Sequence, residues 1–162
     1  MWPDGADIDR RTAIGCALAL TMLPAPARAQ EATQIAAFGD VIDVSAIAPG
    51  DWLRILVDGS PIYVRHRTAG EIAAARNDDD AQFPDPARDA DRAPDPEWLT
   101  VSGLCTHAGC TATCGLGPYR GFLCLCHGSV YDLSGRVRRG PAKRNLAVVR
   151  HKRNRNDLVL LG

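Results

Sequence analysis

Several features that would mark other protein classes are missing from this chain. Its 162 residues carry 19 acidic and 19 basic side chains, so the formal net charge is zero. A balanced charge argues against a broadly basic surface that binds nucleic acid. Phe, Tyr and Trp number only three each, and the sequence has no heptad pattern and no internal repeat. A coiled coil or a repeat protein is therefore not expected.

A long apolar run is also missing. The clearest candidate, residues 12–23, covers about twelve residues, or roughly 18 Å as a helix, which is short against a hydrocarbon core of about 30 Å. It follows Arg10 and Arg11 and precedes an Ala-Arg-Ala sequence at residues 27–29. These are the parts of an export signal, and the paired arginines indicate the twin-arginine route. We expect residues 1–30 to be this signal or, if uncleaved, a short N-terminal helix that anchors the chain.

The remaining sequence predicts a small all-β domain. Gly and Pro, 15 and 11 in number, suit short strands and tight turns better than a helical bundle. After a linker at residues 31–39, we expect an antiparallel sandwich over residues 40–162 with a metal-binding insertion. The expected strands cover residues 40–44, 52–57, 61–65, 98–104, 121–125, 130–133, 146–150 and 158–161.

Three local signals refine this prediction. The sequence Asp58-Gly59-Ser60 lies between two of the expected strands and predicts a hairpin turn. Thr68, with Glu71 three residues later, predicts a capped short helix. Residues 77–97 are rich in Asp and Pro and predict a long solvated loop, and the basic residues 136–155 predict a solvated face.

The cysteines carry the strongest signal. Five of the six lie in two segments or between them, Cys105-Thr106-His107-Ala108-Gly109-Cys110 and Cys124-Leu125-Cys126-His127-Gly128-Ser129. Each segment offers one thiolate and one imidazole close together, plus a spare cysteine. Two thiolates and two imidazoles could hold zinc, or a two-iron cluster with two histidines on one iron. The one-residue Cys-x-His spacing and the near repetition of the two segments favour the cluster.

These residues resemble the Rieske protein of quinol–cytochrome c oxidoreductase, the cytochrome bc complex. The resemblance extends beyond the two segments to Ile62–Thr68 and Asp95–Leu99 upstream, and to Gly128–Asp132 and Gly140–Ala142 downstream. It covers about residues 40 to 150, with the cluster-binding part at about 103–143.

The resemblance implies one Rieske-type [2Fe–2S] cluster per chain. Cys105 and Cys124 would bind the buried iron, and His107 and His127 the outer iron. Cys110 and Cys126 would form a disulfide. The hydroxyl groups of the two remaining site residues, Ser129 and Tyr131, would hydrogen-bond the cluster's sulfur atoms and raise its potential.

The resemblance also implies a function. The cluster would take an electron from quinol, His127 or His107 would accept the proton, and the electron would pass to a c-type cytochrome. The partners would be the cytochrome b and c-type cytochrome subunits of a membrane complex, with this domain on the periplasmic side of a bacterial inner membrane. The alternative is a soluble periplasmic subunit of an oxidase such as arsenite oxidase. A ferredoxin of ring-hydroxylating oxygenases is disfavoured because such modules lack the second cysteine pair.

Four residues depart from the family pattern. Ala108, Leu125 and Lys143 stand where the family has a larger apolar residue, a proline and a proline, and Cys114 is an additional cysteine. We expect the first three departures to affect docking at the site more than cluster binding. Arg65 and Arg67 are expected to form salt bridges, and His66 and His151 are expected to lie outside the site.

Overall fold

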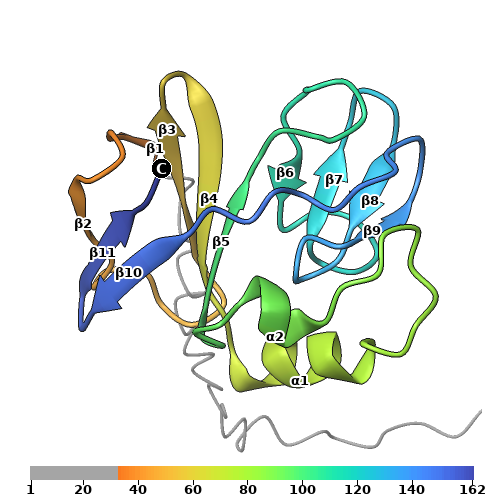
Figure 1. Cartoon of the computed structure of the whole chain (residues 1–162), viewed down its shortest axis with the longest axis horizontal. Helices are drawn as coiled ribbons and strands as arrows, with labels where there is room; N and C mark the ends of the chain where they lie inside the picture. Colours follow the sequence, from red (N-terminus) through yellow and green to blue (C-terminus); the bar gives the residue numbers. More distant parts are fainter. Residues whose placement is uncertain (1–32) are drawn as a thin grey trace, which may run out of the picture.

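The computed structural model describes residues 33–162 (Figure 1). The signal or anchor expected at residues 1–30 lies outside the described residues. Strand β1 (Thr33–Ile35) falls within the expected linker. Within residues 33–162, neither helix is long and apolar enough to cross a bilayer.

The first sheet has the order β1-β3-β4-β5, in which β3 (Trp52–Val57), β4 (Ser60–His66) and β5 (Trp98–Ser102) pair antiparallel. The predicted hairpin is confirmed, because Val57 pairs with Ser60 across a two-residue turn. Asp58 and Gly59 both have positive φ, 50° and 74°, as the favoured two-residue hairpin turn requires. Strand β1 runs parallel to β3, which the antiparallel prediction did not include.

The second sheet packs against the first and completes the predicted sandwich. Its order is β10-β11-β2, built from His151–Asn154, Asp157–Leu160 and Val41–Asp43. Ile42, Leu158 and Leu160 of this sheet are fully buried in one core with Ile55 and Val64 of the first sheet. Burial alternates along β2, β3 and β11, whereas β4 and β5 are buried on both faces over most of their length.

The insertion carries a third sheet of short strands, at the right of Figure 1. Its order is β6-β7-β8-β9, with bounds Thr113–Cys114, Phe122–Cys124, Ser129–Tyr131 and Val137–Arg139. Phe122, Tyr131 and Val137 form a second core that continues into the first sheet through Tyr63 and Val101. Strand β7 lies within the predicted segment 121–125, and β8 overlaps the predicted segment 130–133 at Val130 and Tyr131, whereas the very short β6 and β9 are not among the predicted strands.

Two helices lie below the sheets in Figure 1. Helix α1 (Ala69–Asn77) begins at the predicted cap: Thr68 Oγ1 accepts from the Glu71 backbone N–H, and the Glu71 side chain accepts from the Thr68 N–H. Helix α2 (Asp89–Arg92) lies inside the stretch expected to be a solvated loop. That expectation is wrong, because Phe83 and Asp89 are buried. Their burial depends on partners far away in the sequence.

Those partners are mostly arginines. Arg67 and Ser134 both donate to the buried carboxylate of Asp89. Arg136 is completely buried and donates to Asp132 and Asp79 at 2.8 and 2.6 Å. The prediction that residues 136–155 form a solvated face is therefore wrong for Arg136, because the carboxylates of Asp79 and Asp132 neutralise its buried charge.

The strand expected at residues 146–150 is also absent from the described chain. Leu146 packs in the core of the insertion, and only an isolated bridge between Val148 and Val101 joins this segment to β5. Strand β10 begins one residue later, at His151. Of the apolar run at residues 146–149, Leu146 is buried and Val149 partly buried, whereas Ala147 and Val148 are exposed.

Candidate metal centre

The two cysteine–histidine segments fold as copies of one another. In each, a glycine N–H donates to the carbonyl of the first cysteine: Gly109 to Cys105 and Gly128 to Cys124, both at 2.9 Å. The two glycines have nearly equal positive φ, 74° and 76°, which explains why glycine stands four residues after the cysteine in both. The predicted repetition of the segments is therefore confirmed in the backbone.

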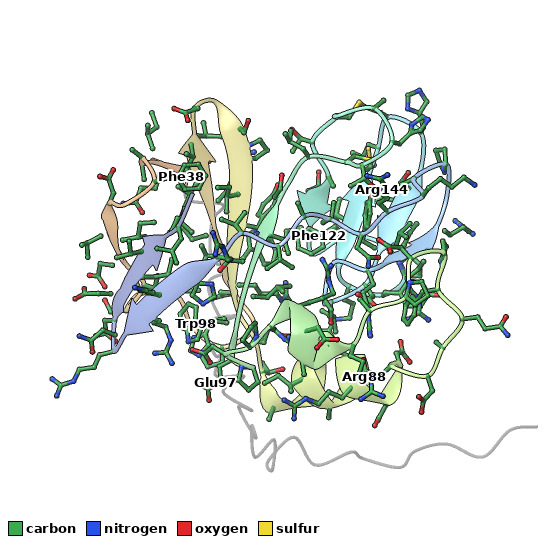
Figure 2. The ribbon with its side chains drawn as sticks, in the orientation of Figure 1. Phe38, Arg88, Glu97, Trp98, Phe122 and Arg144 are labelled. Carbon is green, nitrogen blue, oxygen red and sulfur yellow. A yellow bond between two sulfur atoms is a disulfide. The ribbon has the colours of Figure 1, made fainter. Side chains whose placement is uncertain are left out.

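The insertion fixes where the loops begin and end. A bridge between Leu104 and Thr111 closes the first loop, and the paired ends of β7 and β8, Cys124 and Ser129, close the second. Figure 2 labels Phe122, in the core beneath the loops, and Arg144, in the segment that follows β9. The first loop thus lies between β5 and β6, and the second connects β7 to β8 within the third sheet.

The four expected ligands divide into a buried pair and an exposed pair. The Cys105 and Cys124 side chains are 3% and 1% exposed. His107 and His127 are exposed, and their rings stand edge to face with centroids 4.9 Å apart. The structure therefore brings two thiols together inside the protein and two imidazoles together at its surface.

The spare cysteines join the two loops. Cys110 and Cys126 form a disulfide, with Cα atoms 6.6 Å apart. The sulfur atoms of Cys110, Cys124 and Cys126 lie within 4.8 Å of one another. Because two of these are bonded to each other, they cannot act as thiolate ligands, and only Cys124 of the three is available to a metal.

A hydrogen-bond network surrounds the Cys105 thiol. The Tyr131 hydroxyl lies 3.3 Å from Cys105 Sγ and accepts from the Thr106 backbone N–H at 3.2 Å. Burial on its own would raise the pKa of Cys105, but hydrogen bonds from Tyr131 and the His107 backbone outweigh it and lower that pKa. Burial and the contact with Cys105 raise the pKa of Tyr131 to about 12, so its hydroxyl keeps its proton. Burial, together with the neighbouring Cys105, raises the pKa of Cys124.

The segment after β9 covers the second loop. A Cβ on Gly140 would lie 2.6 Å from Ser129 Cα, and the Ala142 N–H donates to the buried Ser129 Oγ at 3.2 Å. Further along, the Arg144 carbonyl accepts from Thr106 Oγ1 at 2.6 Å. The sequence places residues 140–142 in the expected cluster-binding part, but it gives no signal for the contact between Thr106 and the Arg144 carbonyl.

The surface around the histidines is partly apolar. Leu125, between the two second-loop cysteines, is 71% exposed, and Ala108 beside His107 is exposed as well. Leu125 therefore presents an apolar side chain to any molecule that approaches the histidines.

The residues expected to lie outside the site do so. His66 bonds the Ile47 carbonyl and stacks on Trp98, and His151 bonds Thr100 Oγ1. Arg65 and Arg67 form the expected salt bridges, with Glu71 and Asp89. Cys114 is a free thiol 3.5 Å from Arg65 Nη1. Burial raises the pKa of this thiol to about 11 in spite of the nearby arginine, and a buried thiol that keeps its proton is unreactive.

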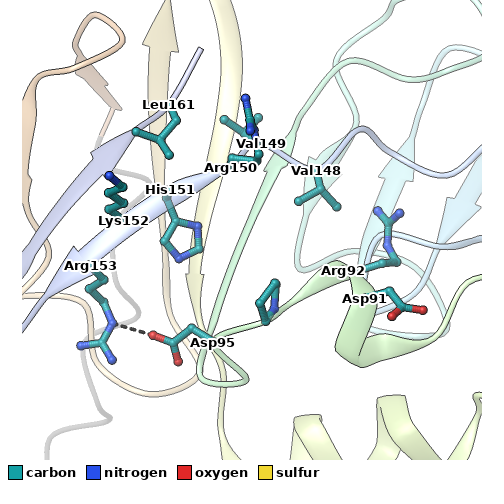
Figure 3. A pocket seen from close by; sticks show the side chains of 11 residues that line it. Asp91, Arg92, Asp95, Val148, Val149, Arg150, His151, Lys152, Arg153 and Leu161 are labelled. Atoms are coloured by element: carbon teal, nitrogen blue, oxygen red, sulfur yellow. Dashed lines mark hydrogen bonds and ion pairs between the residues drawn. The ribbon is translucent and has the colours of Figure 1, made fainter.

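A cleft of about 720 Å³ lies elsewhere, between α2 and β10 (Figure 3). Its charged side chains are largely occupied: Arg153 Nε donates to Asp95 at 2.8 Å, and Arg92 donates to three backbone carbonyls. No residue of the two loops lines it. The chemistry described above is therefore not located in this cleft.

The donors fit a two-iron cluster with mixed ligands. Cluster iron takes thiolates, and a Rieske centre replaces two of four cysteines by histidines on one iron. Two buried thiols beneath two exposed imidazoles provide that division. The hydroxyl group at Cys105 Sγ further suits a site that accommodates added negative charge on reduction.

Comparison with known proteins gives the same result. A model of the Rieske [2Fe-2S] domain matches residues 87–150. The mitochondrial Rieske subunit of the cytochrome b-c1 complex of Schizosaccharomyces pombe is 48% identical over 107 residues, which are 66% of this chain and 47% of the relative. The mitochondrial subunit Rieske-1 of Nicotiana tabacum is 41% identical over 121 residues, 75% of this chain and 47% of the relative.

This chain thus spans about half the length of the curated relatives it matches. Among solved structures, one titled "Hyperthermophilic respiratory Complex III" superposes with a TM-score of 0.51 at 23% identity, over 86% of this chain and 83% of that chain. At this identity the likeness shows the fold alone.

Proposed function

The chain contains a Rieske [2Fe–2S] domain related to the Rieske subunits of cytochrome b-c1 complexes, and from that premise we propose that it is the electron-transfer subunit of a quinol–cytochrome c reductase. It takes an electron and a proton from quinol and passes the electron to a c-type cytochrome. Its partners are the cytochrome b and c-type cytochrome subunits of a membrane complex. The observation that carries the proposal is the exposed pair His107 and His127 above the buried thiols.

The ligand roles are part of this proposal. Cys105 and Cys124 bind the inner iron, and His107 and His127 each bind the outer iron through one ring nitrogen. When bound, the cluster supplies one-electron transfer. The protein keeps water from the thiolates by burying both cysteines, and the Cys110–Cys126 disulfide holds the two ligand loops against each other.

The histidines serve as the contact with quinol. An imidazole that binds a metal through one nitrogen loses the proton of its other nitrogen more readily, because the metal's charge makes it a stronger acid. In that deprotonated form the exposed nitrogen would accept a hydrogen bond and then a proton from a quinol hydroxyl. Both rings are exposed, and the family resemblance favours His127 as the acceptor. The exposed Leu125 lies two residues before His127 and offers an apolar surface to a quinone ring.

We further propose a location on the periplasmic side of a bacterial inner membrane. In this proposal residues 1–30 are a twin-arginine signal or anchor, and residues 40–162 form the Rieske domain. The sequence identity to cytochrome b-c1 subunits supports this role over that of a soluble subunit of a periplasmic oxidase such as arsenite oxidase.

Low-temperature EPR of ascorbate-reduced membranes and of periplasmic extract tests the proposal, with Cys124→Ser as the control that lacks an iron ligand. The expected result is a Rieske signal in membranes that changes when an inhibitor of quinol oxidation is added, with no such signal in the control. A signal confined to the periplasmic extract would assign the chain to a soluble oxidase instead. A protein that contains zinc and gives no signal would overturn the cluster.

A further inference from the structure

A backbone amide fixes the orientation of the Ser129 hydroxyl. Its oxygen is completely buried and accepts the Ala142 N–H at 3.2 Å. A hydroxyl has a single proton, and an oxygen that already accepts one hydrogen bond can direct that proton elsewhere. Ser129 lies directly opposite the expected ligand Cys124 in the β7–β8 ladder, so its side chain lies on the same face of the sheet as that sulfur atom. The position of Ala142 therefore bears directly on where the Ser129 hydroxyl directs its proton.

Ala142 belongs to residues 140–145, which lie outside the strands. This segment is fixed at its far end by Asn145. The Asn145 side chain accepts from the Val137 N–H at 2.8 Å and so connects the segment to the first residue of β9. What holds Asn145 from its other side therefore controls where the segment lies.

Asp85 holds it from that side with two hydrogen bonds. Its carboxylate accepts the Asn145 backbone N–H at 2.8 Å, and its carbonyl accepts the Asn145 side-chain N–H at 2.9 Å. Asp85 is itself held in place. The nearby Phe83 is buried under the Arg136 guanidinium, 4.5 Å from the ring centroid, and the Ala87 carbonyl accepts from Arg136 at 3.2 Å.

We propose that Asp85 is a positioning residue for the cluster: through Asn145 and Ala142 it orients the Ser129 hydroxyl toward sulfur and thereby raises the reduction potential. A hydrogen bond to a cluster sulfur stabilises the reduced, more negative state. The proposal rests on the cluster assignment and is independent of the identity of the electron donor.

The variants Asp85→Ala and Asp85→Asn separate positioning from a direct effect of charge. Asp85→Ala removes the acceptor for the Asn145 N–H, whereas Asp85→Asn keeps an acceptor oxygen of the same shape. Positioning predicts a lower potential for Asp85→Ala and a potential close to wild type for Asp85→Asn. A direct charge effect predicts a rise in both, because either change removes a negative charge that opposes reduction.

The expected fall for Asp85→Ala is a threefold to tenfold decrease in the equilibrium constant for reduction, the range of one weakened hydrogen bond. At 59 mV per tenfold for one electron, this is roughly 30 to 60 mV. The potential is measured by redox titration of the purified holoprotein at one pH, with the visible circular dichroism of the cluster as the signal. EPR integration checks that each variant retains its cluster.

Two comparisons complete the design. Asp80→Ala removes the same charge from the same acidic stretch, but Asp80 is exposed and Asn145 bonds Asp85 instead, so the potential should not fall. In a Ser129→Ala background, Asp85→Ala should cause no further fall, because the group it orients is gone.

If Asp85→Ala loses its cluster, Asp85→Ser takes its place, since a serine hydroxyl is one bond too short to reach the Asn145 N–H. Three results would each overturn the proposal. The first is an unchanged potential in the Asp85 variant that retains its cluster, and the second is a rise in potential in that variant and in Asp85→Asn alike. The third is a fall of the same size when Asp85→Ala is made in the Ser129→Ala background. The quinol reductase role would survive any of these results, because the test measures the cluster's potential and not turnover.

Discussion

Two Arg–Asp pairs of equal hydrogen-bond length lie in different surroundings. Arg136 Nε donates to Asp132 Oδ2 at 2.8 Å, and Arg153 Nε donates to Asp95 Oδ2 at the same 2.8 Å. The first pair is 0% and 6% exposed, whereas the second is 27% and 29% exposed. Replacing Asp by Asn in each pair therefore measures how much burial adds to the contribution of an ion pair to the free energy of unfolding.

Asp132→Asn should cost about 3 kcal/mol. Its oxygen Oδ1 accepts the Ser134 and Arg136 backbone N–H groups, and the amide oxygen of Asn can keep both. The amide nitrogen of Asn, however, would face Arg136 Nε, so two donors would meet and a buried charge would lose one of its two carboxylate partners. Breaking a buried ion pair costs about 3 to 5 kcal/mol. The lower end applies because Asp79 continues to bind Arg136 at 2.6 Å.

Asp95→Asn should cost about 0.2 to 1 kcal/mol, the usual range for a pair that water can reach. Guanidinium unfolding followed by far-UV circular dichroism, with identical incubation for both variants, provides the comparison. With a slope of about 4 kcal/mol per molar, the midpoint should fall by about 0.75 M for Asp132→Asn and by less than about 0.25 M for Asp95→Asn. Equal falls would refute the reasoning, because the hydrogen-bond lengths are the same.

Two further substitutions test the Arg65–Glu71 ion pair and the disulfide between the two metal-binding loops. Burial on its own would raise the pKa of Glu71, but the hydrogen bond and charge of Arg65 outweigh it and lower that pKa. The ionised Glu71 carboxylate therefore stabilises the fold above the unfolded pKa of about 4.3, and this stabilisation is lost as pH falls through the folded pKa. The difference in unfolding free energy between wild type and Glu71→Gln should therefore stay constant from pH 7 to about pH 5 and shrink as the pH falls below about 4.3, and a difference that stays constant down to about pH 3 would contradict the assignment. Replacing both Cys110 and Cys126 by Ser opens a loop with a sequence separation of 16 and should cost about 3 kcal/mol in guanidinium unfolding; a cost below about 1 kcal/mol would show that other contacts hold the loops together.

The features predicted correctly from the sequence are those whose causes are local. The Asp58-Gly59 hairpin depends on two adjacent residues with positive φ, and the start of α1 depends on Thr68 and Glu71. The two metal-binding loops are short, so each displays its thiol, its imidazole and its glycine within a few residues of sequence. Local chemistry of this kind can be identified without knowledge of the partner segment.

The errors arise where a charged side chain is neutralised by a distant one. Arg136 lies 57 residues from Asp79, and Asn145 lies 60 residues from Asp85. Nothing in the composition of an acidic stretch distinguishes carboxylates that face water from carboxylates that face a buried arginine. The sequence therefore predicts that both the acidic and the basic segment are solvated, although they bind each other.

The mutual binding of these segments matters because the insertion has little regular structure of its own. Its strands contain two or three residues each, so few ladder hydrogen bonds define where β8 and β9 lie. Hydrogen bonds from outside supply the missing constraints: Arg136 and Arg138 bind Asp79 and Asp78. The geometry of the two loops therefore depends on a segment that contributes no ligand. A change in the acidic stretch reaches the metal centre through these bonds, whereas an equal change at the distant end of the sandwich has no such route.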